Sequence, residues 1–203
     1  MSPAKERDKS KKRALIINGA EDIFLSMGYE LASMDKIAAK AGVSKRTVYN
    51  HFNSKENLFE VIVADLLAQR QNLKTIKYDR EKTLEEQLLA FAESEIFLID
   101  SPRRIELSRF LTITFLKDLE FQRKTVAKSP SVYDMLIEWL KEAENDGRIK
   151  ADNIFMLARI FYALVIGAIT WPALFTDGIN KEAVKPVLDE LIAVFLARYE
   201  NII

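Results

Sequence analysis

The chain has 203 residues, of which 49% are hydrophobic and 30% charged, and its formal net charge is zero. This composition is typical of a soluble globular protein with one or two domains. The sequence contains no cysteine and a single histidine. It therefore excludes disulfides, thiolate metal sites and histidine clusters, and it predicts a cytoplasmic protein without a metal or cofactor.

The charges are unevenly distributed. Residues 1–56 contain 11 Lys/Arg and 7 Asp/Glu, so the N-terminal quarter is basic and the remainder is acidic. A basic segment favours a polyanionic partner, although lysine and glutamate also solvate ordinary helices. We therefore predict two domains with different tasks, residues 1–56 and residues 57–203.

The predicted elements of the first quarter are all helical, because apolar residues recur at helical spacing and no useful strand pattern occurs. Residues 1–10 are charged, and we expect them to be disordered until bound. Serines that can cap helices precede the second, third and fourth helices. The predicted helices are 11–27, ended by Gly28, then 34–41 after Ser33, 45–52 after Ser44, and 55 to about 77 after Ser54.

The remaining chain predicts five more helices, which makes an all-α fold of about nine helices. A capping box at Thr83–Glu86 and a proline at the first helical position, Pro102, begin two of them. We expect Asp152 to cap the longest apolar helix and Pro172 to end it. The predicted ranges are 84–99, 102–118, a helix within 129–146, 153–171, and 181–199 with Pro186 at its regular start or at a bend.

The two short helices around "AGVS" predict a helix-turn-helix, in which Gly42 and Val43 form the turn. At 100° per residue, Val48 and Phe52 of the third helix form a narrow apolar stripe, and its other side carries donors and acceptors. Arginine can bond guanine and asparagine can bond adenine in a major groove. The single histidine therefore lies on a helix that is suited to reading DNA.

The stretch "A…IF…GY…SMDKIAAKAGVSKRTVYNHFNSKENLF" resembles the N-terminal domain of the tetracycline-repressor (TetR) family of bacterial transcriptional regulators, over residues 11–59. The resemblance implies base contacts from Lys45, Arg46 and Asn50. It implies phosphate contacts from Thr47, Tyr49, His51 and Lys55, and from Ser33 at the start of the second helix. Ser44 is also predicted to belong to the DNA-binding residues. It also implies that the basic arm with Lys9, Lys11, Lys12 and Arg13 reaches DNA. His51 has an alternative interpretation, packing against the start of the fourth helix.

The apolar stretch Ile154–Phe175 carries one charge, Arg159. Its length would permit a membrane span, but the preceding Asp152 and Asn153, Arg159 and Pro172 argue against one, so we expect no membrane partner. A helix that is apolar all round must be covered on every side, which predicts a homodimer, as the resemblance also implies. The predicted interface residues are Ala163, Gly167, Ala168, Leu188, Leu191, Ile192 and Phe195.

Aromatic residues are concentrated beyond residue 90, and "WLKEAENDGRI" faintly resembles the AefR-like type of C-terminal domain. The family resemblance implies a cavity there for a small effector, which we expect to be lipophilic or aromatic. For any single ring, a place in the core is the simpler explanation. The candidate ligand residues are Phe91, Phe110, Trp139, Arg159, Tyr162, Thr170 and Trp171, with Glu93 as a further polar candidate.

Three hypotheses remain from the sequence. The first is a homodimeric repressor that binds an inverted-repeat operator on double-stranded DNA and is released by a ligand. The second is a helical enzyme, which the single histidine and the absence of cysteine disfavour, so we predict no catalytic residue. The third is a DNA-binding dimer without a small ligand, which is controlled by a protein partner, is constitutive, or is an activator.

Overall fold

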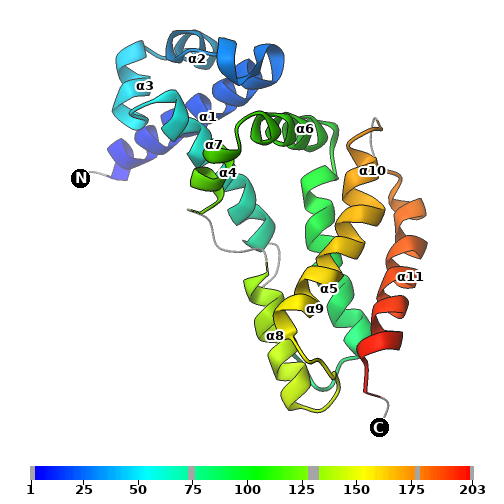
Figure 1. Ribbon diagram of the computed structural model, residues 1–203. Coiled ribbons are helices and arrows are strands. Elements are labelled where there is room, and N and C mark those ends of the chain that lie inside the picture. Colours follow the sequence, from blue (N-terminus) through cyan, green and yellow to red (C-terminus); the bar gives the residue numbers. More distant parts are fainter. Residues whose placement is uncertain (1–2, 73–75, 128–132, 177–178, 202–203) are drawn as a thin grey trace. The chain divides into compact units, whose positions relative to one another are not determined.

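The computed structural model describes residues 3–72, 76–127, 133–176 and 179–201. Over these ranges it confirms the all-α prediction (Figure 1). The elements in order are α1 (Pro3–Leu31), α2 (Met34–Ala41), α3 (Lys45–His51), α4 (Lys55–Asn72), α5 (Leu84–Ile96), the 3₁₀ turn η1 (Phe97–Ile99), α6 (Pro102–Lys117), α7 (Leu119–Val126), α8 (Asp134–Asn145), α9 (Ile154–Val165), the π-helical turn η2 (Ile166–Thr170), α10 (Trp171–Ala173) and α11 (Lys181–Tyr199).

Several predicted boundaries are corrected by the structure. Helix α1 begins at Pro3, so residues 3–10 are helical rather than disordered. The predicted end of α4 near Lys77 is wrong, because residues 76–78 are not helical; residues 73–75 lie outside the described ranges. Helix α7 was not predicted separately. Asn153 rather than Asp152 caps α9, because the Asn153 side chain accepts the backbone N–H of Met156.

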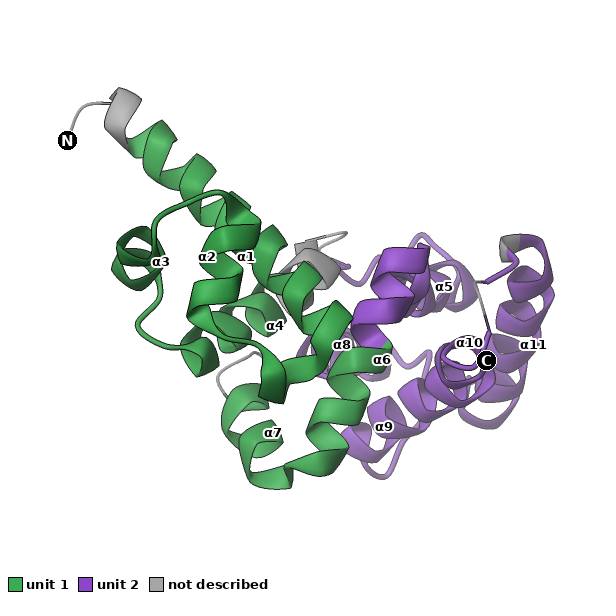
Figure 2. Ribbon diagram, turned by 90° about the horizontal axis from the view of Figure 1, so that it is seen from above, with its two compact units in different colours: residues 1–67, 109–128 green, residues 68–108, 129–203 purple. Residues whose placement is uncertain are grey.

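The chain forms two compact units (Figure 2). Unit 1 consists of residues 1–67 and 109–128, and unit 2 consists of residues 68–108 and 129–203. Helix α6 is therefore divided between the units. The compact units are defined by packing. The boundary after residue 56 was predicted to separate two functions, and it remains a prediction.

Unit 1 is built around aromatic side chains. Phe59 of α4 is fully buried, and its ring centroid lies 5.0 Å from that of Phe121 and 6.0 Å from those of Phe110 and Phe115. Phe110 also stacks on Phe24 of α1, with ring centroids 5.7 Å apart. These rings join α6 and α7 to the helices of the first quarter.

Unit 2 has its own core, in which α5, α8, α9 and α11 pack together. Its buried polar group Gln87 is satisfied, because its Oε1 accepts the Trp139 indole N–H at 2.9 Å and its Nε2 donates to the Asp79 carbonyl at 2.8 Å. The end of α11 is fixed to the loop before α9 by an antiparallel bridge between Ile149 and Glu200. A buried polar group with complete hydrogen bonds fixes one arrangement of these helices.

Candidate nucleic-acid interface

The helix-turn-helix is set by local signals that the sequence already contains. Ser33 caps α2 by accepting the Lys36 N–H at 3.3 Å, and Ser44 caps α3 by accepting the Thr47 N–H at 3.1 Å. Gly42 adopts the left-handed conformation at φ 66° and ends α2. A glycine adopts this conformation without the steric cost of a side chain. The predicted caps and turn are therefore present.

Helix α3 has one buried side and one exposed side. Val48 and Phe52 are buried at 0% and 2% exposure, which matches the predicted stripe. Lys45, Arg46, Tyr49 and Asn50 are exposed, and Thr47 is partly buried. The helix therefore presents a row of donors and acceptors to solvent, as a helix that lies in a major groove must do.

Two of these side chains already have partners within the protein. The Lys45 ammonium lies 2.8 Å from the Asp35 carboxylate of α2, which raises the pKa of Lys45. The Thr47 hydroxyl lies 2.8 Å from the Ser44 hydroxyl. Because the Lys45–Asp35 pair is well exposed, exchanging the carboxylate for a phosphate or a base edge costs little.

His51 lies at the end of α3, partly buried, near the basic residues of α1. Burial lowers the pKa of His51, and the charges of Lys9, Arg13 and Lys12 lower it further. The ring is therefore neutral at physiological pH and can donate or accept a hydrogen bond. The His51 ring centroid lies 6.2 Å from that of Phe52, and the Arg13 guanidinium of α1 lies 5.9 Å from the centroid of the same Phe52 ring.

Lys55 at the start of α4 is held by the end of α1. Its ammonium donates to the Tyr29 carbonyl at 2.8 Å and lies 4.3 Å from the centroid of the Tyr29 ring. On the arm, Lys12 pairs with Asp8 at 2.7 Å and Arg13 pairs with Asp65 at 3.2 Å. The phosphate contacts that we predicted for these side chains remain predictions, and each would have to share its donor with these partners.

The predicted ligand residues do not form one cluster. Phe91, Trp139 and Tyr162 are at most 1% exposed in the core of unit 2, whereas Phe110 belongs to unit 1. Arg159 is exposed, and Trp171 is 50% exposed. Thr170 lies in η2, and among the described residues its hydroxyl is buried without a hydrogen-bond partner.

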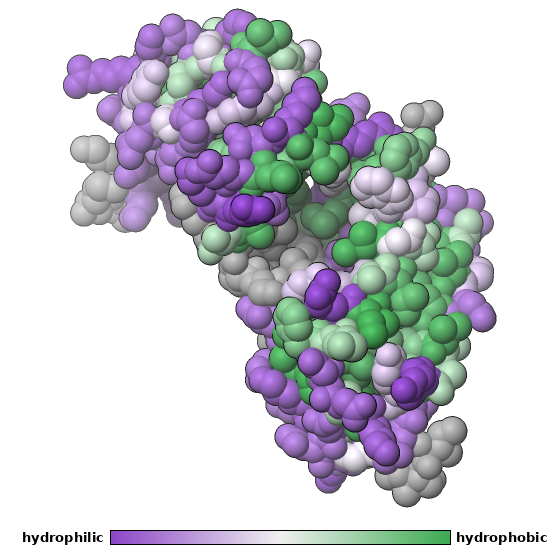
Figure 3. Space-filling model, in the orientation of Figure 1, coloured by the Kyte–Doolittle hydropathy of each residue, from purple (hydrophilic) through white to green (hydrophobic). Residues whose placement is uncertain are grey.

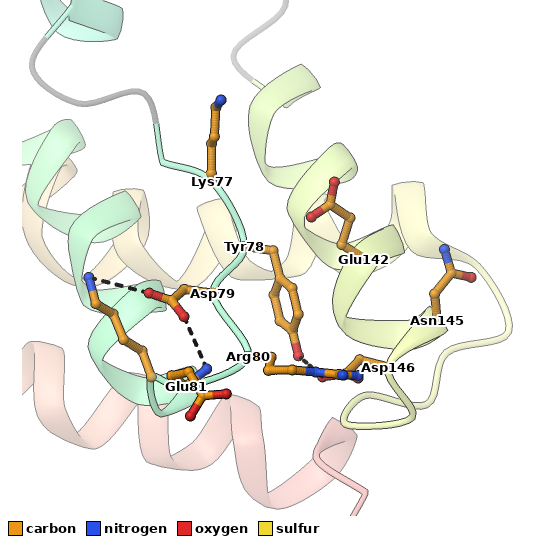
Figure 4. Close-up of a pocket in the computed structure, with 9 residues that line it drawn as sticks. Lys77, Tyr78, Asp79, Arg80, Glu81, Glu142, Asn145 and Asp146 are labelled. Atoms are coloured by element: carbon orange, nitrogen blue, oxygen red, sulfur yellow. Dashed lines mark hydrogen bonds and ion pairs between the residues drawn. The ribbon is translucent and has the colours of Figure 1, made fainter.

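Among the described residues of unit 2, two hollows are notable. One, of about 390 Å³, lies between α5, η1 and α11 and includes Glu93 and Phe97 in its lining. The other, of about 890 Å³, lies between segment 77–82 and the end of α8 (Figure 4). In the second hollow Tyr78 and Arg80 converge on Asp146, and the Tyr78 hydroxyl donates at 2.6 Å. These contacts fasten the segment to α8.

The predicted dimer residues fall into two groups. Ala163, Gly167 and Ala168 are exposed, as an interface requires. Leu188, Leu191, Ile192 and Phe195 are at most 7% exposed, because they pack in the core of their own unit. Their assignment to an interface is corrected on this ground. The exposed apolar residues that accompany the first group are Phe155, Met156, Ile166, Trp171, Phe175, Val187 and Val194.

Comparison with known proteins agrees with this architecture. Residues 16–62 match the model of bacterial regulatory proteins of the tetR family, and residues 86–201 match the model of the AefR-like transcriptional repressor C-terminal domain. A crystal structure of a TetR family transcriptional regulator from Pseudomonas syringae pv. tomato is 30% identical, with a TM-score of 0.75 over 94% of this chain and 97% of that chain.

The names of two further relatives indicate different properties. The Flavonoid-responsive Regulator FrrA is 25% identical, with a TM-score of 0.76 over 94% of this chain and 98% of that chain. The HTH-type transcriptional activator FasR of Mycolicibacterium smegmatis is 35% identical over 79 residues, which are 36% of this chain. The match likewise spans only 36% of the length of FasR.

Proposed function

Because this chain belongs to the TetR family of bacterial transcriptional regulators, which are DNA-binding proteins and not enzymes, we propose that it is a cytoplasmic homodimeric repressor that a small ligand releases from its operator. The observation that carries the DNA part of the proposal is α3, whose polar side is exposed while Val48 and Phe52 are buried. Arg46 and Asn50 on that side are the proposed base-reading residues.

The test for DNA recognition is selection from randomised duplexes followed by affinity measurement. Arg46→Ala and Asn50→Ala should each lower affinity by about 1–3 kcal/mol and relax the preference at one base pair in each half-site. Arg123→Ala, which removes an exposed arginine from α7, is the matched control and should bind as the wild type. If both α3 variants keep the wild-type preference, α3 is not the reading helix.

The homodimer is proposed from the exposed apolar face along α9, η2, α10 and α11. Hydrophobic residues gather over these helices in Figure 3, and Met156, Trp171 and Val194 are each at least half exposed. The stretch Ile154–Ala173 would be long and apolar enough to cross a membrane by composition alone, and only 33% of its apolar window is buried. A second copy of the chain would cover this face, and its two-fold symmetry explains why we expect an inverted-repeat operator.

The ligand part of the proposal rests on unit 2. A buried hydroxyl without a partner costs about 1–3 kcal/mol, so Thr170 is the proposed polar anchor. The same unit contains the buried rings of Phe161 and Tyr162, whose centroids lie 5.8 Å apart. These rings suit a lipophilic or aromatic compound. FrrA, which is named for its response to flavonoids, supports an aromatic effector for a chain of this architecture.

The release mechanism is tested by linkage. If a ligand weakens operator binding by some factor, operator DNA must weaken ligand binding by the same factor. Calorimetry measures the ligand affinity of the free protein and the ligand affinity of the protein–operator complex. Equal ligand affinity in the two titrations would show that the ligand is not an inducer.

A second candidate function is transcriptional activation, because FasR is named as an activator. The two functions are distinguished by a reporter placed behind the selected operator. Repression predicts that reporter output rises when the gene for this protein is deleted, whereas activation predicts that it falls.

A further inference from the structure

A pocket of about 610 Å³ lies within unit 1. Its volume is in the range of sites for small organic molecules. One wall comes from the end of α1 and the start of α4, and the other comes from α6 and α7. The lining residues are Met27, Gly28, Tyr29, Glu30, Leu31, Glu56, Phe110, Ile113, Thr114, Lys117, Asp118 and Phe121.

The pocket has an aromatic interior. The Tyr29 ring lies 5.3 Å from Phe121 and 5.2 Å from the buried Phe59, measured between centroids. Phe110, which the sequence placed among the ligand residues, lines this pocket and no described pocket of unit 2. Gly28 leaves space in the wall, because a Cβ atom at this position would have no neighbour within 4 Å.

The charged residues of the lining are mainly acidic. It contains the carboxylates of Glu30, Glu56 and Asp118 and one cationic group, Lys117. Hydrogen bonds from its own backbone and from Ser54 lower the pKa of Glu56, so this carboxylate is ionised at neutral pH. Asp118 is held in place because it accepts the Phe121 N–H at 2.9 Å.

The Tyr29 hydroxyl remains neutral in this environment. Burial, followed by the charge of Glu56, raises the pKa of Tyr29. Lys55 is not part of the lining, and its ammonium is bonded to the Tyr29 carbonyl. Among the lining residues themselves carboxylates outnumber the single ammonium group. Two further ammonium groups are already bound to the wall: Lys55 lies 4.3 Å from the centroid of the Tyr29 ring, and Lys36 donates to the Leu31 carbonyl at 3.0 Å.

We propose that this pocket binds an organic cation with an aromatic or branched apolar body. The body would lie on Tyr29, Phe110 and Phe121, and its charge would be balanced by the surrounding carboxylates, since cations are also attracted to aromatic faces. The inference goes beyond the proposed function, because the site lies in the unit that contains the helix-turn-helix and is separate from the effector cavity proposed for unit 2.

The probe is tetraphenylphosphonium, and its control is tetraphenylborate, which has nearly the same size and shape and the opposite charge. Calorimetry with the full chain should show binding of the cation at one site per chain and no binding of the anion at this site. Raising the salt concentration should weaken the cation, because the carboxylates are partly exposed and are screened by salt.

Three variants locate the site. Glu56→Gln and Asp118→Asn each remove one charge, and asparagine can still cap α7. Each should weaken the cation about two- to fivefold, since exposed charges interact modestly. Ile113→Trp should weaken binding because the larger side chain occupies part of the pocket, and Ile113 is 54% exposed, so the larger ring need not disturb the core. Glu120→Gln on α7, outside the lining, should bind as the wild type.

Several outcomes would overturn the inference. These are no binding of the cation, equal binding of the anion, or wild-type affinity in both Ile113→Trp and the Glu56→Gln/Asp118→Asn double variant. Circular dichroism tests whether each variant is folded. If Ile113→Trp does not fold, the two charge variants still test whether the cation binds in this pocket. Operator binding measured on the same proteins separates the two ideas, because loss of cation binding with intact operator binding rejects only this inference.

Discussion

The single histidine gives the interface a measurable pH response. The pKa of His51 is lowered from 6.5 by burial and by Lys9, Arg13 and Lys12. A lowered pKa means that folding favours the neutral ring. This contribution to stability is fully present above pH 6.5 and is lost as the pH falls through the folded-state value. We expect His51→Gln to flatten the pH dependence of the free energy of unfolding below pH 6.5.

The measurement is a set of urea denaturation curves from pH 7.5 to pH 5, together with proton NMR of the imidazole. No other histidine contributes to that signal, because the chain contains one. A titration midpoint at or above 6.5 in the free protein would contradict the prediction. On DNA the midpoint should rise, because a nearby phosphate favours the charged ring.

A second residue tests the proposed ligand anchor. Thr170→Val removes a buried hydroxyl that has no described partner and keeps the β-branched shape, so the free energy of unfolding should rise by roughly 1 kcal/mol. Thr83→Val is the contrasting control, because the Thr83 hydroxyl accepts the Glu86 N–H at 3.1 Å in the capping box of α5. It should lower stability by about 1 kcal/mol.

Thermal and urea denaturation of both variants give the result. If Thr170→Val is less stable than the wild type, the hydroxyl is satisfied in solution and is a poor candidate for a ligand contact.

Residue roles that depend on neighbouring sequence could be predicted, and those that depend on distant contacts could not. The caps at Ser33 and Ser44 follow from a serine before a helical pattern, and they are present. A phosphate contact was predicted for Lys55 from the neighbouring sequence alone. In the structure its ammonium donates to the carbonyl of Tyr29, 26 positions away in sequence. No local pattern reports a partner at that separation.

At the scale of elements, the close approach of α1 and α2 can be tested through Gly19. A Cβ atom at Gly19 would lie 3.0 Å from both the Cβ and the backbone nitrogen of Ala41. Gly19→Ala should therefore lower the free energy of unfolding by about 1–2 kcal/mol, although alanine is the better helix former. The pair of helices also positions the turn before α3, so operator binding should weaken as well.

Ser10→Ala provides the control, because Ser10 is an exposed residue of the same helix α1. Urea denaturation should show it to be as stable as the wild type. Equal stability of the Gly19→Ala variant would mean that α1 and α2 can separate without cost.

Helical periodicity predicted which segments are helices better than it predicted which side of a helix is covered. Helix α11 was predicted at 181–199 and is found at Lys181–Tyr199. Its apolar residues lie on two sides, and the sequence does not say which side meets the chain's own core. The choice of Leu188 and Ile192 for the interface was therefore wrong, and Val187 and Val194 are the exposed members. Phe110 shows the same limit, because its ring partners lie on α1 and α4.

At the scale of the whole molecule, the proposed dimer predicts two disruptive substitutions. Val194→Glu places a charge on the exposed side of α11, and Gly167→Glu places one on η2. A buried unpaired charge is strongly unfavourable, so sedimentation should show monomers or aggregates, and operator affinity should fall with the loss of the second half-site.

Val126→Glu is the control, because it introduces the same charge at an exposed valine of α7 in unit 1. It should remain dimeric. If Val194→Glu and Gly167→Glu also remain dimeric and bind the operator, the subunits meet through another face.

Unit 1 is formed by two separate stretches of the chain, and this limits how chimeras with other regulators can be made. Unit 1 needs residues 109–128 as well as residues 1–67, because the buried Phe59 is surrounded by the rings of Phe110, Phe115 and Phe121. A chimera joined by a single cut after residue 67 would expose Phe59 and Phe24 unless the new partner supplied equivalent rings. Exchanging the C-terminal part between such regulators therefore requires transplanting α6 and α7 together with the helix-turn-helix, and a library of single-crossover hybrids should contain few folded members.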